Sequence, residues 1–292
     1  MARHPESMTT ATSSAGESLA QRIIAKIFAD HFKPGVDEVA FRRDELVAAA
    51  EALGEPRPKN LGDIVYSLRY RVPLPDSVRE AAPPNTEWAI FPGGNAVYVL
   101  VLRAVPFNLI EPRKGIRTVR LPDSTPGVIA KYAMSDEQAL LAILRYNRLL
   151  DVFTGLACYP LQSHLRTSVT VENAIDGTSS SSQVETDDLY VGLDEHGAHY
   201  MLPVQAKGGS DALSVIQIWQ DFRVTEQKFP DLLARPIAAQ FMANDEIALF
   251  EFAESDNKIT IARERHYELV PSDQLSAEEL QTYRQAASHK PQ

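Results

Sequence analysis

Residues 183–211 read QVETDDLYVGLDEHGAHYMLPVQAKGGSD, and this stretch decides the fold of the second half of the chain. The segment 194–197 is a typical turn between strand-forming residues, so a second strand is predicted over 198–207. Side chains alternate along a strand, which puts Gln205 and Lys207 on one face, called here the Gln-x-Lys face. An acidic cluster precedes the turn and consists of Glu185, Asp187 and Asp188. The hairpin can therefore bring a carboxylate, an amide oxygen and an ammonium together.

The length of the turn decides which aspartate joins the Gln-x-Lys face. If Leu193 pairs with Ala198, Asp188 lies on that face. A turn one residue longer or shorter brings Asp187 there instead, because a shift of one residue exchanges the two faces of a strand. The residues alone leave both aspartates open.

Oxygen ligands at this face suit a hard cation. Two carboxylates of the acidic cluster can hold one hard cation such as Mg²⁺ through their oxygens and leave positions for water and a phosphate. Lys207 can polarise or deprotonate the attacking water and stabilise charge in the transition state. Gly208 and Gly209 have no side chains, so a DNA backbone can come close. This combination is the minimum for hydrolysis of a phosphodiester.

Length and composition predict a globular protein of two domains. The chain has 292 residues, of which 44% are hydrophobic and 23% charged. No apolar run approaches the roughly 20 residues that span a bilayer, and the N-terminus has no apolar core of a signal peptide. We therefore expect a cytoplasmic protein that does not contact a membrane.

The net charge of −10 argues against a nucleic-acid partner, but its distribution weakens this objection. Residues 1–120 carry 16 Lys and Arg against 14 Asp and Glu, whereas residues 121–292 carry 13 against 25. A first half that approaches phosphates and a second half that gathers divalent cations would have this distribution. An acidic domain that is merely soluble would have it too.

The first hundred residues have the element order of a winged helix. A polar, disordered tail is predicted over 1–16, followed by a domain over 17–104. This domain begins with three helices, of which the last two span about 43–53 and 59–70, and it ends with a β-hairpin around Pro92–Asn95. In a winged helix the third helix enters the DNA major groove. The candidate DNA contacts are Arg42, Arg43, Lys59, Arg69 and Arg71.

Two other interpretations of this region stay open. The basic residues are equally compatible with solvated helix faces, and winged helices also bind proteins.

The remaining chain is predicted to be a linker over 105–134 and an α/β domain over 135–292 with a central mixed sheet. A buried helix is expected from a capping box at Ser135, and a second helical piece, carrying Gln162, His164 and Arg166, over about 160–170. The four serines 179–182 are typical of a flexible loop. A helix capped at Ser210–Asp211, three strands and a final helix capped at Ser276 follow the hairpin.

Five segments of this half carry a resemblance to a known family. They are DEQALLAILRYNRLLDVF, SHLRTSV, QVETDDLYVGLD, LPVQAKGGSD and PIAAQF. With Asp187 or Asp188 followed by Gln205-Ala206-Lys207, they resemble the PD-(D/E)xK nuclease superfamily, and more closely bacterial endonucleases of restriction type. The closer resemblance covers about residues 105–255.

The resemblance implies a Mg²⁺-dependent endonuclease that cuts double-stranded DNA. It implies Asp187 or Asp188 as a metal ligand, with Asp187 favoured, Gln205 as the second ligand and Lys207 as the catalytic lysine. By analogy with type II restriction enzymes, we expect a homodimer and a cognate DNA methyltransferase in the same system.

The chain departs from the common pattern at Gln205, where a neutral amide replaces a carboxylate. The metal is then held less tightly unless Glu185 or Glu172 contributes. Two alternative functions follow: a winged-helix regulator or adaptor with an inactive nuclease-like domain, and a nuclease of DNA repair or recombination.

Overall fold

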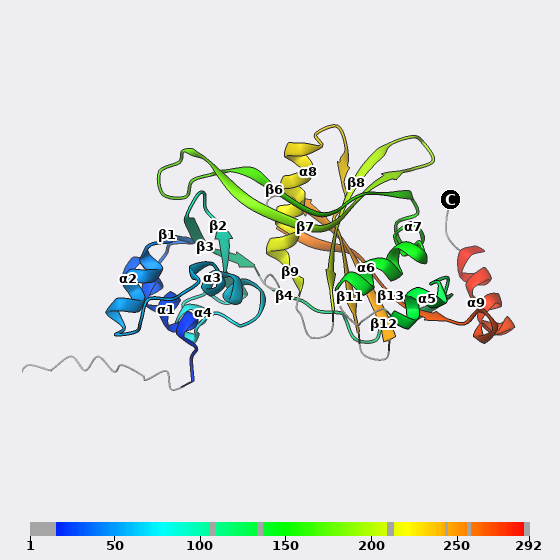
Figure 1. The fold of residues 1–292 in the computed structure, drawn as a ribbon, viewed down its shortest axis with the longest axis horizontal. Coiled ribbons are helices and arrows are strands. Elements are labelled where there is room, and N and C mark those ends of the chain that lie inside the picture. Colours follow the sequence, from blue (N-terminus) through cyan, green and yellow to red (C-terminus); the bar gives the residue numbers. More distant parts are fainter. Residues whose placement is uncertain are drawn as a thin grey trace, which may run out of the picture.

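The computed structural model describes residues 16–104, 109–132, 137–208, 213–242, 245–255 and 258–288. Figure 1 shows a small unit of helices and a three-stranded sheet beside a large mixed sheet that helices flank. The predicted α/β class with a mixed sheet is therefore confirmed. The tail predicted over 1–16 lies outside the described residues, apart from Gly16.

The small unit contains the three predicted helices and the predicted hairpin. A capping box between Ser18 and Gln21 starts the first helix, and the Asn60 side chain caps the third by accepting from the Gly62 N–H. The first strand and the short fourth helix were not predicted from the sequence. The helices are α1 (Leu19–His31), α2 (Glu45–Ala52), α3 (Leu61–Tyr70) and α4 (Asp76–Glu80). The strands, in sheet order, are β1 (Glu38–Arg42), β3 (Val97–Ala104) and β2 (Thr86–Pro92).

The small sheet is buried on both faces. Trp88, Ile90 and Leu100 pack against the helices of the small unit. The alternate residues of the same strands, which include Ala89, Phe91, Val99 and Val101, belong to a second apolar cluster with residues of the large unit. Such runs of apolar residues without alternation are typical of strands covered on both sides. The small and large units thus share an apolar core.

The large sheet has the order β5-β13-β12-β11-β8-β7-β6, and β10 also pairs with β8. The β8–β11, β8–β10 and β5–β13 pairs are parallel and the others are antiparallel. The strands are β5 (Thr118–Pro122), β6 (Ala157–Glu172), β7 (Ser179–Leu193), β8 (His199–Lys207), β10 (Leu233–Ala234), β11 (Ile237–Phe241), β12 (Glu246–Ser255) and β13 (Lys258–Val270). A separate two-stranded pair joins β4 (Leu109–Ile110) to β9 (Leu213–Ser214).

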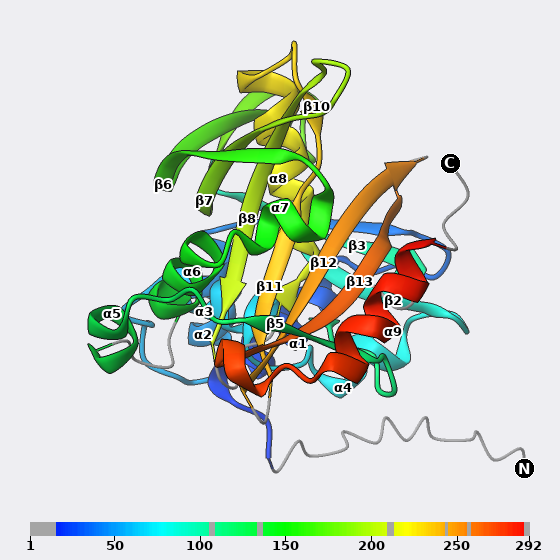
Figure 2. The same ribbon diagram turned by 90° about the vertical axis from the view of Figure 1, so that its right-hand side faces the viewer.

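Helices cover both faces of the large sheet. Figure 2 shows α6 and α7 in front of the sheet and α8 behind it. The capping Ser135 and Asp136 lie outside the described residues, and the predicted long helix is divided by Arg148, which has a left-handed backbone. The helices are α5 (Gly127–Tyr132), α6 (Glu137–Tyr146), α7 (Leu149–Thr154), α8 (Val215–Lys228), the short 3₁₀ helix η2 (Ser272–Gln274) and α9 (Ala277–Ser288). None of the described helices is both long and apolar enough to cross a bilayer.

Two predictions for residues 157–193 are wrong. The expected helix over 160–170 is part of the strand β6, so Gln162, His164 and Arg166 lie on a strand. Residues 165–171 alternate in type and are rich in β-branched side chains, which favours a strand over a helix. The serines 179–182 were predicted as a flexible loop. They form the start of β7, next to the β6–β7 turn, and pair with residues 169–172 of β6.

The predicted linker 105–134 contains structure that belongs to the large unit. Its residues 118–122 form β5, which is an edge strand of the large sheet. Arg113 binds Glu264 with 2.6 Å between Nε and Oε2, and Arg120 binds Glu279 of α9 with 2.8 Å between Nη1 and Oε1. Arg113 and Arg120 of this segment therefore form ion pairs with β13 and α9.

The β6–β7 hairpin reaches across to the small sheet (Figure 1). The Ala174 N–H donates to the Gly93 carbonyl at 2.9 Å, and the Asn95 N–H donates to Ser180 Oγ at 2.6 Å. Gly94 has φ +119, and a Cβ there would lie 3.0 Å from Ser180 Oγ, so this turn requires glycine. These contacts join the hairpin end to the β2–β3 turn.

Helix α6 is expected to be a major source of stability because Leu140 is fully buried between α6 and the large sheet (0% exposed). Leu140→Ala should lower the free energy of unfolding by about 2–5 kcal/mol, since it removes apolar contacts and leaves a cavity. Urea unfolding followed by circular dichroism measures the change. Leu280→Ala in α9, where the leucine is 54% exposed, is the matched control and should change the value by less than about 0.5 kcal/mol. Equal losses in the two variants would contradict this view of α6.

Candidate active site

The β7–β8 register decides which aspartate joins the Gln-x-Lys face. Leu193 pairs with His199 across a turn of residues 194–198, and Asp188 pairs with Val204. Residues opposite each other in an antiparallel pair share a face, so Asp187 lies with Gln205. The turn is one residue longer than the one that would favour Asp188.

Asp188 lies on the opposite face of the sheet, under α6. Its Oδ2 accepts from Arg145 Nη2 at 2.7 Å and its Oδ1 accepts from Ser163 Oγ at 2.8 Å. The carboxylate is fully buried and satisfied by these partners. Asp188 therefore forms an internal ion pair with Arg145, on the face of the sheet away from Lys207.

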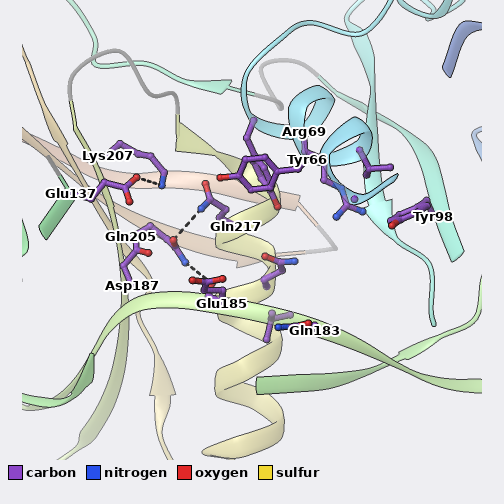
Figure 3. A pocket seen from close by; sticks show the side chains of 15 residues that line it. Tyr66, Arg69, Tyr98, Glu137, Gln183, Glu185, Asp187, Gln205, Lys207 and Gln217 are labelled. Atoms are coloured by element: carbon purple, nitrogen blue, oxygen red, sulfur yellow. Dashed lines mark hydrogen bonds and ion pairs between the residues drawn. The ribbon is translucent and has the colours of Figure 1, made fainter. Parts of the chain in front are cut away.

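Lys207 is held by a glutamate from the large unit's first long helix. Its Nζ lies 2.7 Å from Glu137 Oε1, at the start of α6 (Figure 3), and the lysine is 8% exposed. Burial lowers the pKa of Lys207, but the hydrogen bond that its ammonium donates to Glu137 and the charge of Asp187 outweigh this effect, so the pKa is raised. Lys207 is therefore an ammonium at neutral pH and is better suited to stabilising negative charge than to removing a proton.

Gln205 is fixed by a buried acid on α8. Its Nε2 donates to both carboxyl oxygens of Asp221 at 3.1 Å, and the amide is 1% exposed. Its Oε1 accepts from Gln217 Nε2 at 3.2 Å. Because the nitrogen is bound to Asp221, the oxygen is directed away from that acid, and a carbonyl oxygen has a second lone pair for a ligand. Asp221 thus orients the Gln205 oxygen.

Asp221 has the most perturbed carboxyl of the site. Burial raises the pKa of Asp221 to about 8, although hydrogen bonds from Thr186 and Gln205 oppose the rise. The Thr186 hydroxyl donates to its Oδ1 at 2.6 Å. At neutral pH this carboxyl is mostly protonated, so a neutral acid lies behind the neutral amide.

Asp187 supplies the accessible carboxylate of the Gln-x-Lys face. Its Oδ2 accepts from the Ala206 N–H at 2.8 Å, and among the described residues no hydrogen bond engages Oδ1. Burial raises the pKa of Asp187, partly offset by the Ala206 N–H and Lys207. One carboxylate oxygen and the Gln205 carbonyl oxygen are ligands that Mg²⁺ accepts, with water and phosphate at its other positions. These residues fit the predicted cation.

These side chains open into a cavity of about 350 Å³. The large unit contributes β7, β8, α6 and α8 to it, and the small unit contributes α3 and β3. Glu185 lines this cavity and also pairs with His164 and Arg166 at 3.2 Å. Glu172, the other carboxylate considered as an extra ligand, lies at the far end of β6 and is not part of the lining.

Of the five residues predicted to contact DNA, four are exposed on the small unit and one lines the cavity. Arg43, Lys59 and Arg71 are exposed on the small unit. Arg42 is also exposed but lies close enough to Asp176 to help Thr178 lower the pKa of that carboxyl. Arg69 instead lines the cavity, and its Nε donates to the Ile90 carbonyl at 2.8 Å.

Glu137 and Asp221 were not predicted from the sequence to be part of the site. Glu137 was considered only as part of a helix cap, and its contact with Lys207 joins residues 70 positions apart. Asp221 left a signal, because Gln217, Gln220 and Asp221 are polar residues beside the apolar stripe of the helix predicted after the hairpin. Buried polar groups on such a helix need partners, and functional sites are one place where they find them.

The raised pKa of Asp221 generates a prediction on stability. An aspartate in an unfolded chain has a pKa of about 3.9, and the folded pKa is about 8. Between these pH values the folded state binds one more proton than the unfolded state, so this group lowers stability as pH rises, by on the order of 5 kcal/mol in total. Asp221→Asn should remove this loss, and urea unfolding between about pH 4 and pH 8 measures it. Asp273→Asn, at an exposed position, is the control and should follow the wild type; an Asp221→Asn curve parallel to the wild type would contradict the assignment.

In comparisons with known proteins, the chain matches no family model, no curated protein sequence and no solved structure.

Proposed function

We propose that the chain is a Mg²⁺-dependent DNA endonuclease that hydrolyses phosphodiester bonds of double-stranded DNA. The observation that carries the proposal is the convergence of Asp187, Gln205 and Lys207 on one cavity, with Glu137 bound to the lysine. A carboxylate, a carbonyl oxygen and a buried ammonium are the groups that bind a divalent cation and a phosphate together.

Each residue has a distinct task in this proposal. Asp187 and Gln205 hold Mg²⁺, which when bound activates water and offsets charge on the phosphate. Asp221 holds the Gln205 side chain in place by accepting from the amide nitrogen, which would leave the amide oxygen available to the ion. Lys207 donates to a phosphate oxygen and stabilises its growing negative charge, while Glu137 keeps the ammonium in place.

The small unit supports DNA as the substrate. Its element order α1-β1-α2-α3-α4-β2-β3, with sheet order β1-β3-β2, resembles that of a winged helix with the short α4 added before β2. The strand β1, not expected from the sequence, adds to this likeness. The exposed Arg43, Lys59 and Arg71 provide cations for phosphates. The large mixed sheet between α6 and α8 is compatible with a restriction-endonuclease-like core.

The narrower proposal is a type II restriction enzyme. Cutting both strands at one short site takes two active sites, so the proposal includes a homodimer and a methyltransferase that protects the same sequence. A nuclease of DNA repair or recombination would use the same site chemistry. Incubation with methylated and unmethylated plasmid, with and without Mg²⁺, distinguishes them: a restriction enzyme gives discrete fragments from one of the two plasmids.

One observation favours a second candidate, a winged-helix regulator or adaptor without catalysis. Gln205 is neutral and is hydrogen-bonded at both its nitrogen and its oxygen. The position of Asp187 beside Gln205, on the face of Lys207, favours the enzyme.

Lys207→Ala should abolish Mg²⁺-dependent cleavage of duplex DNA, because it removes the ammonium that stabilises the transition state. DNA binding should persist, since the exposed cations of the small unit are unchanged. Plasmid nicking and linearisation measure cleavage, and fluorescence anisotropy measures binding. Lys258→Ala, at an exposed lysine at the start of β13, is the control and should cleave like the wild type. Undiminished cleavage by Lys207→Ala would falsify the assignment of the site.

Substitution of the exposed cations Arg43, Lys59 and Arg71 by Ala should weaken DNA binding and reduce its salt dependence. Each phosphate contact that is lost should lower the slope of log K against log salt by about 0.9. Anisotropy titrations over a range of NaCl concentrations give the slopes, with Lys258→Ala as the control. Unchanged slopes in all three variants would move DNA recognition to another surface.

A further inference from the structure

Helix α3, the predicted major-groove helix, forms one side of the catalytic cavity. Tyr66, Arg69 and Tyr70 of α3 line the same space as Asp187 and Lys207. In Figure 3 the Tyr66 side chain extends from α3 toward Lys207. The side chains of α3 on this face are therefore directed at the site that cuts, inside the protein.

The position of α3 is fixed by packing. The small sheet behind it shares an apolar cluster with α8 and the large sheet. Phe91 of β2 and Trp219 of α8 meet edge to face with ring centroids 5.6 Å apart. The β6–β7 hairpin adds hydrogen bonds at Gly93 and Asn95. A movement of α3 away from the site would have to break this packing, so the cavity is a stable feature of the fold.

The cavity has the size of a small-molecule site. Its volume of about 350 Å³ falls at the lower end of the range for pockets that enclose small ligands. A stacked, paired segment of duplex is far larger, whereas a single nucleotide is of this size. The cavity can therefore take a phosphodiester at Asp187 and Lys207 together with its own unpaired base, whereas a base pair does not fit inside it.

The lining matches a nucleobase in chemical type. Tyr66 is 46% exposed and meets the Tyr70 ring edge to face with centroids 4.8 Å apart, and the Arg71 guanidinium lies over its ring at 5.0 Å from the centroid. A base can stack on the exposed part of Tyr66 or on the Arg71 guanidinium beside it. The amides of Gln183, Gln217 and Gln220 offer donors and acceptors for the edge of a base. Proteins bind unpaired bases with this combination of an aromatic surface and polar side chains.

Two buried polar atoms in the lining lack partners among the described residues. Arg69 Nη2 is a donor and Gln217 Oε1 is an acceptor, and both are shielded from water without a hydrogen bond. Leaving such atoms unsatisfied is costly, and each such group calls for an explanation. A base that accepts from Arg69 and donates to Gln217 would satisfy both.

We propose that the cavity binds one unpaired nucleotide of the DNA strand that is cut, with its base against Tyr66 and its phosphate toward Asp187 and Lys207. The inference rests on the proposed function and narrows its substrate: the nucleotide at the cut is extruded from the duplex or is already unpaired. Extrusion costs least where a base is mismatched. Mismatched duplex and single strands are therefore preferred to fully paired duplex of the same sequence.

Binding tests this without requiring catalysis. Fluorescein-labelled DNA of one sequence is prepared as a fully paired duplex, as a duplex with one central mismatch, and as a single strand. Anisotropy without Mg²⁺ should show about tenfold tighter binding of the mismatched duplex than of the paired one. Tyr66→Ala should remove this preference, a loss of about 5- to 150-fold in affinity for the unpaired nucleotide, because stacking on one aromatic ring is worth this factor. Tyr66→Phe should retain it.

Tyr159→Ala, at an exposed tyrosine of β6 outside the cavity lining, is the matched control and should behave as wild type. Equal binding of the paired and mismatched duplexes, or a preference that survives in Tyr66→Ala, overturns the inference. Cleavage of the same DNAs with Mg²⁺ separates the two proposals. Cleavage that needs Lys207 but ignores pairing leaves the endonuclease standing and rejects the unpaired nucleotide. A Tyr66-dependent binding preference without any cleavage supports the nucleotide site and rejects the endonuclease.

Discussion

Burial of the small sheet on both faces is the constraint on which the rest of the molecule depends. The residues of β2 and β3 that alternate with Trp88, Ile90 and Leu100 cannot remain in water, and α8 with the large sheet covers them. Because one thin sheet serves two cores, the orientation of the small unit is set by hydrophobic packing rather than by a flexible connection. Residues 17–104 on their own would expose Ala89, Phe91, Val99 and Val101, so this segment is a poor choice for expression as an isolated domain.

The site contains two neutral groups next to each other. Gln205 carries an amide, and Asp221 behind it holds a proton at neutral pH because its burial disfavours the charged form. An ionised Asp221 next to Asp187 and Glu137 would add a third negative charge near Lys207. The charged groups Asp187, Glu137 and Lys207 therefore lie on the side that faces the cavity. The buried Asp221 orients the Gln205 amide and does not bind an ion.

Local patterns in the sequence predicted local structure well. The helices of the small unit, the β2–β3 hairpin and the strands β11 to β13 follow from spacing, caps and turn residues within a few positions. The helix expected over 160–170 was wrong because β-branched residues and pairing with β7 outweigh the polar residues of that segment. For the site, the sequence predicted a carboxylate, an amide oxygen and an ammonium on one hairpin. The identity of the aspartate depended on one residue of turn length, and Glu137 is joined to Lys207 only by the tertiary fold.

The turn between β7 and β8 carries more information than its exposed position indicates. Asp194 closes it by accepting from the backbone N–H groups of His196 and Ala198, and the Tyr200 hydroxyl binds the same carboxylate. Surface turns usually tolerate insertions and deletions. Here the insertion or deletion of one residue would place Asp188 instead of Asp187 at the cavity. The insertion or deletion of two residues would leave Asp187 on the cavity face. Natural variation in the length of this turn should therefore occur in even steps wherever the Gln-x-Lys face is kept.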